Sequence, residues 1–251
     1  MNIFLKMTLT ELKLSMRNIV FVLATILLPL GLIILFGGLY GNDLTPNNLR
    51  LFGMGAVSAS APAYLALALA IIALIGMPQH LVSYKENKVL KRLKATPIQK
   101  YQILLPIFVN YIILFIIGMI LLFSYAWIMF DVRLQGGFFE FTFAVIISVL
   151  SMFSLGFLLS CMCKTVKGVT GIGFAILIPL AFLSGTTMPL GAFPDAIGTV
   201  SNLVPLTHAV ELMRNTFTGT VSFIDNMLHI GVLSGIFIVC TILSFLLFRW
   251  E

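Results

Sequence analysis

Three side chains that could take part in acid–base or ion-pair chemistry stand three residues apart near the end of the sequence: His208, Glu211 and Arg214. Residues at this spacing share one face of a helix. Pro205 suits the first turn of that helix, and Asn202 upstream is a candidate cap. The cluster could touch a substrate or gate an exit path, or it could be a structural Glu–Arg pair that holds neighbouring helices together. The structural interpretation is the simpler one.

The segment that precedes this cluster is unusually interrupted. Between Phe182 and Pro194 its backbone is broken by Gly185, Pro189 and Gly191. It is too apolar for a solvated loop and too interrupted to cross a membrane. We therefore expect re-entrant or interfacial helices over residues 185–224.

A second candidate segment is strongly basic and covers residues 80–101. Residues 85–95 are good helix formers and end before Pro97, which predicts a short helix. Its apolar stripe consists of Val89, Leu90 and Leu93. Such a helix gains from an anionic partner. The partner could be the lipid headgroups or a soluble protein that binds the helix, and the residues alone leave both open.

Several motifs that carry chemistry are missing from the sequence. It contains no G-x-x-x-x-G-K-[ST], no H-E-x-x-H and no G-x-S-x-G, so we expect no nucleotide bound through a P-loop and no hydrolase of these types. Cys161 and Cys163 have no histidine nearby and make a poor zinc site. We therefore expect no catalytic residue, cofactor or metal in this chain.

The composition excludes a soluble enzyme. Hydrophobic residues make up 60% of the 251 residues, charged residues only 10%, and the mean hydropathy is +1.10. A soluble domain carries about 25% charged residues. The apolar runs are long and continuous, which predicts an all-α membrane protein rather than a barrel. The net charge of +6 comes from basic residues that flank these runs, so we do not expect nucleic acid as a partner.

The chain is predicted to form one transmembrane domain over residues 1–251. Residues 1–17 suggest an amphipathic helix on the membrane surface, because Lys6, Thr10, Lys13 and Arg17 fall on one stripe, whereas Glu11 does not fit it. The spans contain almost no ionisable residues, which argues against a proton- or ion-coupled transporter. Six spans are expected at 18–40, 54–79, 102–130, 139–163, 168–184 and 227–248.

The basic residues orient these spans. Arg50, Arg133 and Arg214 lie on one side of the predicted membrane. The positive-inside rule places the other side, which is far richer in Lys and Arg, in the cytoplasm. We therefore expect a multi-pass protein of the cell membrane with both termini, the 80–101 loop and the 164–167 turn inside. The basic residues of that side are Lys6, Lys13, Arg17, Lys85, Lys88, Lys91, Arg92, Lys94, Lys100, Lys164, Lys167 and Arg249.

Two motifs, in these positions, resemble the permease subunit of type 2 ABC transporters, mostly bacterial exporters. After span two, that family has a Glu followed by Leu-x-x-Leu-x-x-(Thr/Ser)-Pro, which Glu86, Leu90, Leu93, Thr96 and Pro97 match. The family often has Arg-Gly-Thr after the Glu, whereas this chain has Asn87-Lys88-Val89. After span five, a second motif is matched by Phe182, Leu183, Ser184, Gly185, Pro189, Phe193, Pro194, Pro205, Leu206, His208 and Arg214.

The resemblance implies an N-terminal elbow helix and a permease that forms a homodimer, or a heterodimer with a similar permease, in the lipid bilayer. ATP and Mg would be bound by a separate ABC-type ATPase, and this chain would export an amphipathic substrate such as a drug, an antimicrobial peptide or a lipid-like molecule. The coupling residues would be Glu86, Val89, Leu90, Leu93, Thr96 and Pro97. The external gate would comprise Ser184, Gly185, Pro189, Phe193, Pro194, Pro205, His208, Glu211 and Arg214.

Two other classes of function compete with an exporter. A membrane-embedded enzyme or channel would use a polar site at the outer face, built on His208, Glu211 and Arg214. A scaffold would instead anchor a soluble complex through its basic loop.

Overall fold

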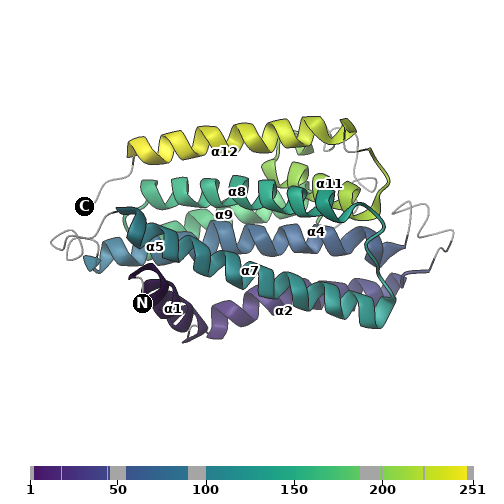
Figure 1. The fold of residues 1–251 in the computed structure, drawn as a ribbon, viewed down its shortest axis with the longest axis horizontal. Coiled ribbons are helices and arrows are strands. Elements are labelled where there is room, and N and C mark those ends of the chain that lie inside the picture. The colour runs from purple at the N-terminus through teal and green to yellow at the C-terminus, as the bar shows by residue number, and fades with distance from the viewer. Residues whose placement is uncertain are drawn as a thin grey trace.

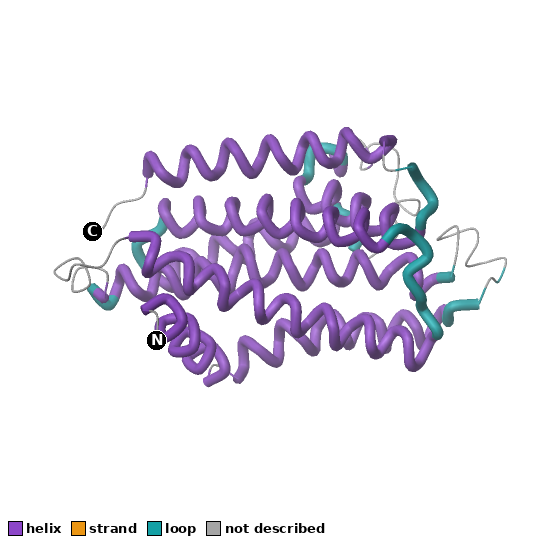
Figure 2. Tube along the Cα trace, in the orientation of Figure 1, coloured by secondary structure: helices purple, strands orange, loops and turns teal. Residues whose placement is uncertain are grey.

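The computed structural model describes residues 3–17, 19–43, 45, 55–89, 100–186, 198, 200–222 and 224–247. Every regular element in these ranges is helical, and the long helices lie side by side in one bundle (Figures 1 and 2). The prediction of an all-α membrane protein is confirmed. The helices are α1 (Ile3–Arg17), α2 (Ile19–Tyr40), α4 (Ala56–Ile71), the π-helix η1 (Ile72–Gly76), α5 (Met77–Glu86), α7 (Lys100–Phe130), α8 (Phe138–Met162), α9 (Val166–Leu183), α11 (Pro205–Thr218), the short 3-10 helix η3 (Ile224–Asn226) and α12 (Met227–Leu247).

Five helical stretches are long and apolar enough to cross a membrane. They are Ala56–Glu86, Gln102–Phe130, Phe138–Met162, Val166–Leu183 and Ile224–Leu247. A further apolar helix, α2, has 22 residues, which is close to the ~20 residues that a crossing needs. The count of six spans and the membrane position of α1 remain predictions.

One continuous helix forms the centre of the bundle and consists of α4, η1 and α5. Of its most apolar stretch, 94% is buried within the protein. Helices α2, α7, α8, α9 and α11 all pack against it, and Figure 1 shows α12 and α2 on opposite sides of the bundle with α4 between them. At 1.5 Å per residue, its 31 residues extend roughly 46 Å. This helix is therefore longer than the hydrocarbon core of about 30 Å.

Glycines let α8 and α9 approach the backbone of the π-helix. A Cβ atom at Gly156 of α8 would overlap the Ala73 carbonyl oxygen, and one at Gly173 of α9 would lie 2.6 Å from the Leu74 carbonyl oxygen. Small residues permit such close backbone contact between helices in membranes. The Tyr111 hydroxyl of α7 donates to the Gly76 carbonyl, 2.9 Å away. Three helices thus meet the backbone of η1.

The central helix continues further than the sequence suggested. Span two was predicted to end at residue 79, with a loop over 80–101, but α5 runs to Glu86. The polar residues that suggested a loop find partners on α1, α8 and α9, so the helix can retain them. The short helix predicted for residues 85–95 is also interrupted, because residues 87–88 form a turn and Lys88 has a φ of 55°.

The bundle has two different ends. The end that we call the basic end contains α1, the last turn of α5, the α8–α9 turn and the last turn of α12; the opposite end contains the connection from α7 to α8 and helix α11 (Figure 1). This arrangement groups the described basic residues of the predicted cytoplasmic side at one end. Both the first helix and the last helix reach that end.

Candidate functional site

Helix α1 attaches to the basic end through a buried polar face. Lys6, Thr10, Lys13 and Arg17 are exposed as predicted, whereas Glu11 is only 5% exposed. Its Oε1 atom accepts a hydrogen bond from the Tyr84 hydroxyl at 2.7 Å, and its Oε2 atom lies 3.2 Å from His80 Nε2. The carboxylate that broke the predicted stripe thus holds α1 against α5.

A cavity of about 300 Å³ lies beside this contact, between α1, α5, α7 and the start of α9. A hydrogen bond near its wall also joins α1 to α7: Asn110 Nδ2 donates to Ser15 Oγ at 2.7 Å. The lining includes Ser15, Gly76, Gln79, His80, Ser83 and Tyr111.

The last two residues of α5 contact the ends of two other helices. The Lys85 ammonium donates to the Ser160 carbonyl oxygen at 2.6 Å, near the C-terminus of α8. The Glu86 carboxylate accepts from the Val166 backbone N–H at 2.7 Å, at the first residue of α9. A helix is partially negative at its C-terminus and partially positive at its N-terminus, so each charge faces the helix end that favours it. We call these two contacts the α5 clasp.

The α8–α9 turn that the clasp holds is short and well capped. The Thr165 side chain accepts a hydrogen bond from the Gly168 N–H at 3.2 Å, as an N-cap of α9. Helix α9 therefore begins at Val166, and Lys167 lies in its first turn rather than in the connecting turn. Burial raises the pKa of the Cys163 thiol, although the nearby Lys85 partly offsets the increase.

The predicted coupling residues lie only partly within the described chain. Glu86 is exposed and its carboxylate has the intramolecular partner described above, while Val89 is half-buried. Leu90, Leu93, Thr96 and Pro97 lie outside the described residues.

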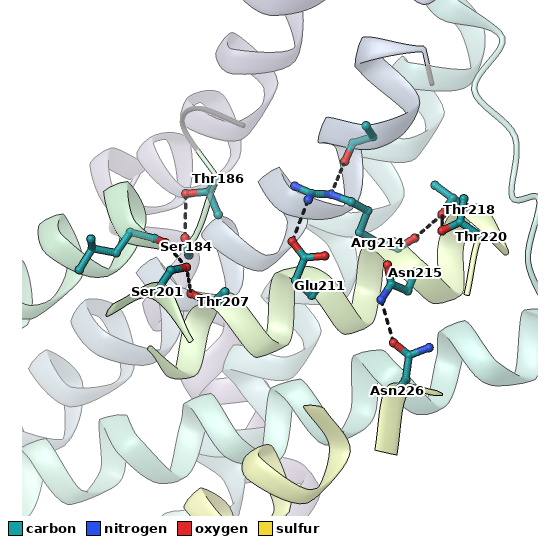
Figure 3. Close-up of polar contacts among 12 residues, drawn as sticks. Ser184, Thr186, Ser201, Thr207, Glu211, Arg214, Asn215, Thr218, Thr220 and Asn226 are labelled. Atoms are coloured by element: carbon teal, nitrogen blue, oxygen red, sulfur yellow. Dashed lines mark hydrogen bonds and ion pairs between the residues drawn. The ribbon is translucent and has the colours of Figure 1, made fainter. Parts of the chain in front are cut away.

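At the opposite end, hydroxyl groups close the end of α9 onto the start of α11 (Figure 3). Ser184 and Thr186 both donate to the Ala181 carbonyl, at 3.2 and 2.7 Å, and Gly185 between them has a φ of 73°, a conformation that glycine adopts readily. Ser201 Oγ donates to the Leu183 carbonyl at 2.7 Å and lies 3.2 Å from Thr207 Oγ1. Of the other predicted gate residues, Pro189, Phe193 and Pro194 lie outside the described residues.

Pro205 occupies the first position of α11, and the helix is buried among α4, α8, α9 and α12. It ends at Gly219, which has a φ of 65° and lies close to the backbone of Gly136. The backbone N–H groups of Gln135 and Gly136 both donate to the Phe217 carbonyl at 3.0 Å. The 14-residue helix is about 21 Å long, which is too short to cross the bilayer.

Within the polar cluster, Glu211 and Arg214 form an ion pair, whereas His208 has other partners. Arg214 Nη1 lies 2.9 Å from Glu211 Oε1 on the same helix, and Arg214 Nε donates to the Ala59 carbonyl of α4 at 3.1 Å (Figure 3). His208 lies between the Asn202 carbonyl and the His229 Nδ1 atom, each 2.9 Å away. Because a carbonyl can only accept, His208 Nε2 donates to it. Arg214 therefore joins α11 to α4, whereas His208 joins it to α12.

Asn42 is a structural residue that the sequence did not single out. Its Nδ2 atom donates to the Phe130 carbonyl at the end of α7. Its Oδ1 atom accepts from the backbone N–H and the hydroxyl of Ser58, each at 3.0 Å. Asn42 thus caps the first turn of α4 from a distant segment and connects it to α2 and α7. A lone Asn after an apolar run indicates only a turn, so no local signal predicts this role.

Comparison with known proteins agrees with this architecture. Over a segment of 74 residues, the chain is 34% identical to Nodulation protein J of Rhizobium leguminosarum bv. viciae and 32% identical to Nodulation protein J of Rhizobium meliloti (strain 1021). Each match covers 30% of this chain and 28% of the relative. The family described as ABC-2 type transporter matches residues 4–218, from α1 through the end of α11. An all-helical membrane bundle that matches this family over most of its length belongs to it: the chain is a member of the ABC-2 type transporter family.

Proposed function

We propose that this chain is the permease subunit of an ATP-driven exporter that moves an amphipathic substrate, such as a drug, an antimicrobial peptide or a lipid-like molecule, out of the cell. A separate ABC-type ATPase binds ATP and Mg, and two permease chains, identical or similar, form the path. Membership of the family makes this chain the membrane subunit of an ABC transporter, whereas its substrate, the direction of transport and its partners are proposed here.

The observation that carries the proposal is the position of the central helix. It is buried along its apolar length and continues to Glu86 at the basic end, directly before the basic segment that connects it to α7. A force applied to that segment would act on the helix against which α2, α7, α8, α9 and α11 all pack. A bundle built in this way can receive movement from a soluble subunit.

The distribution of charge supports an external source of energy. Within the described helices, Glu140 lies in the first turn of α8 and Asp225 precedes α12. Helix α7 has no acidic or basic residue after Lys100. A transporter driven by an ion gradient generally needs ionisable side chains inside its spans. In the five candidate spans the acidic and basic side chains lie near the helix ends, which favours ATP hydrolysis on a partner.

The exposed surface of the bundle supports an apolar path between two chains. Helices α9 and α12 bury only 17% of their most apolar stretches within this chain. Five of the exposed side chains of α9 are large and apolar: Ile172, Phe174, Ile176, Ile178 and Phe182. A second permease against such a face would create a hydrophobic path, which suits amphipathic substrates better than ions.

The proposal is tested by co-expressing the chain with candidate ABC-type ATPases that have a P-loop and no membrane spans, and by reconstituting the complex in proteoliposomes. We expect substrate movement only with ATP and Mg, and none when the P-loop lysine of the ATPase is changed to Ala. Transport by the purified chain alone, driven by an ion gradient, would refute it. Changing Leu90 and Leu93 to Asp should abolish coupling between hydrolysis and transport while the chain still inserts in the membrane.

An outer-face enzyme or channel is the less favoured function. Glu211 is paired with Arg214, whose guanidinium also donates to the Ala59 carbonyl, and His208 contacts His229 instead of this pair. Activity of the purified single chain that disappears on changing these three residues to Ala would favour that alternative.

A further inference from the structure

The α5 clasp involves two adjacent residues with opposite charges that reach opposite kinds of helix end. Lys85 is half-buried and contacts a carbonyl near the C-terminus of α8, and Glu86 contacts the first N–H of α9. The carboxylate satisfies one of the N–H groups that a helix N-terminus leaves unpaired, and the ammonium satisfies a carbonyl of the last turn. The clasp thus bridges both sides of the α8–α9 turn from one point.

Further contacts along the same helix bind the same two neighbours. Gln79 Nε2 of α5 donates to Thr170 Oγ1 of α9 at 2.8 Å, nearly two helical turns before the clasp. Deeper in the bundle, Gly156 and Gly173 allow α8 and α9 to touch the backbone of η1. Contacts with α8 and α9 therefore extend from Ala73 to Glu86, which is about 20 Å of helix.

We propose that Lys85 and Glu86 are positioning residues that lock α5 to the α8–α9 turn, so that α5, α8 and α9 move as one body when the basic segment after Glu86 is displaced. The lock itself follows from contacts within this chain. Its role in transport rests on the proposed function, because that function supplies the ATPase that would displace the segment.

A lock between specific groups and a simple effect of net charge predict different results when the two residues are exchanged. If only net charge mattered, exchanging the residues would be harmless, because Lys85→Glu with Glu86→Lys leaves the total unchanged. The lock requires instead that the cation face the end of α8 and the anion face the start of α9. The exchanged variant would place each charge at the unfavourable helix end.

The first test measures hydrogen exchange of peptides that cover residues 160–170, with the parent and variant chains purified in lipid nanodiscs without any ATPase. In the exchanged variant and in Lys85→Met/Glu86→Gln we expect the amides around Val166 to exchange about fivefold faster or more, because the charges that hold the turn are reversed or removed. The matched control is Lys13→Met/Glu140→Gln, which removes the same two charge types from exposed positions and should leave the rate unchanged. Equal exchange in all four proteins would overturn the lock.

The second test measures substrate transported per ATP hydrolysed by the reconstituted complex. Lys85→Met, which keeps the predicted coupling residue Glu86, should bind the ATPase and hydrolyse ATP but transport at least about fivefold less substrate per ATP than the parent, since α8 no longer follows α5. An unchanged ratio would overturn the positioning role. If the parent bound no ATPase, the proposed function would fail, yet the exchange experiment would still decide whether the lock exists.

Discussion

Replacing Gly156 with Ala should weaken the contact between α8 and the π-helix. The new methyl group would overlap the Ala73 carbonyl oxygen, and it would also crowd the Met77 side chain. The overlapped atom belongs to the backbone of the buried central helix, so it cannot rotate away as a flexible side chain would. Helix α8 must therefore move outward and lose part of its packing against η1.

The size of the effect follows from two opposing contributions. Overpacking a dense core costs typically 1–3 kcal/mol, and a backbone neighbour places Gly156 at about the upper end of that range. Alanine is about 1 kcal/mol more favourable than glycine inside a helix. The net loss in the free energy of unfolding is therefore about 2 kcal/mol, which corresponds to a fall in Tm of about 4–8 °C for a chain of this size.

The assay is thermal unfolding of the purified protein in detergent, with Gly118→Ala and Gly235→Ala as controls. A methyl group at either control position meets no other atom within 4 Å, so both should leave Tm unchanged or raise it slightly. The Tm of Gly173→Ala should lie between that of Gly156→Ala and those of the controls, because its methyl group would lie 2.6 Å from the Leu74 carbonyl oxygen. If Gly156→Ala unfolded at or above the temperature of the controls, the close contact with η1 would be wrong.

Three further changes test the polar contacts by the same Tm measurement. Glu11→Gln, which removes the charge of a buried carboxylate, should lower stability by about 2 kcal/mol, whereas Lys6→Gln on the exposed stripe should have little effect. Arg214→Met should cost about 2 kcal/mol, since it leaves the Ala59 carbonyl without its side-chain donor, and a Tm equal to the parent's would remove its role in joining α11 to α4. Asn42→Ala should cost about 1 kcal/mol, because α4 loses a helix cap. Asn42→Asp keeps the oxygen that accepts from Ser58 but loses the donor to the Phe130 carbonyl, so restored stability in this variant would show that the cap, and not the contact with α7, stabilises the protein.

The sequence predicts the helical runs well because the bilayer imposes a simple condition on each of them. A segment of about 20 apolar residues must be a helix to satisfy its backbone, and this condition does not depend on the rest of the chain. The end of the helix that contains span two was predicted less well. The polar residues from Gln79 to Glu86 suggest solvent when read alone, yet in the structure they contact α1, α8 and α9. Such partners lie too far away in sequence for periodicity to reveal.

In the candidate site, too, local features could be predicted from the sequence, whereas features that depend on helix packing could not. Glu11 was recognisable as an exception to an exposed stripe, and its burial explains the exception. The close approach at Gly156 and the cap supplied by Asn42 depend on how helices pack, so neither has a local pattern. The predicted cluster of His208, Glu211 and Arg214 does share a helix, and Glu211 and Arg214 form the structural pair that the spacing suggested. His208 instead contacts α12, because its position on α11 faces a different surrounding helix.

The central helix is held by polar contacts near both of its ends, which restricts how it can move. At the opposite end its Ala59 carbonyl binds Arg214 of α11, and at the basic end Lys85 and Glu86 bind the α8–α9 turn. A displacement of α5 must therefore either shift α11 or be absorbed between the two contacts. The π-helix at 72–76 is the irregular segment between them, and π-helical turns are frequent at functional sites. Gly156 and Gly173 bring α8 and α9 against this segment, so bending of the π-helix would move those helices as well. Movement at the basic end would therefore reach the opposite end through α8, α9 or α11.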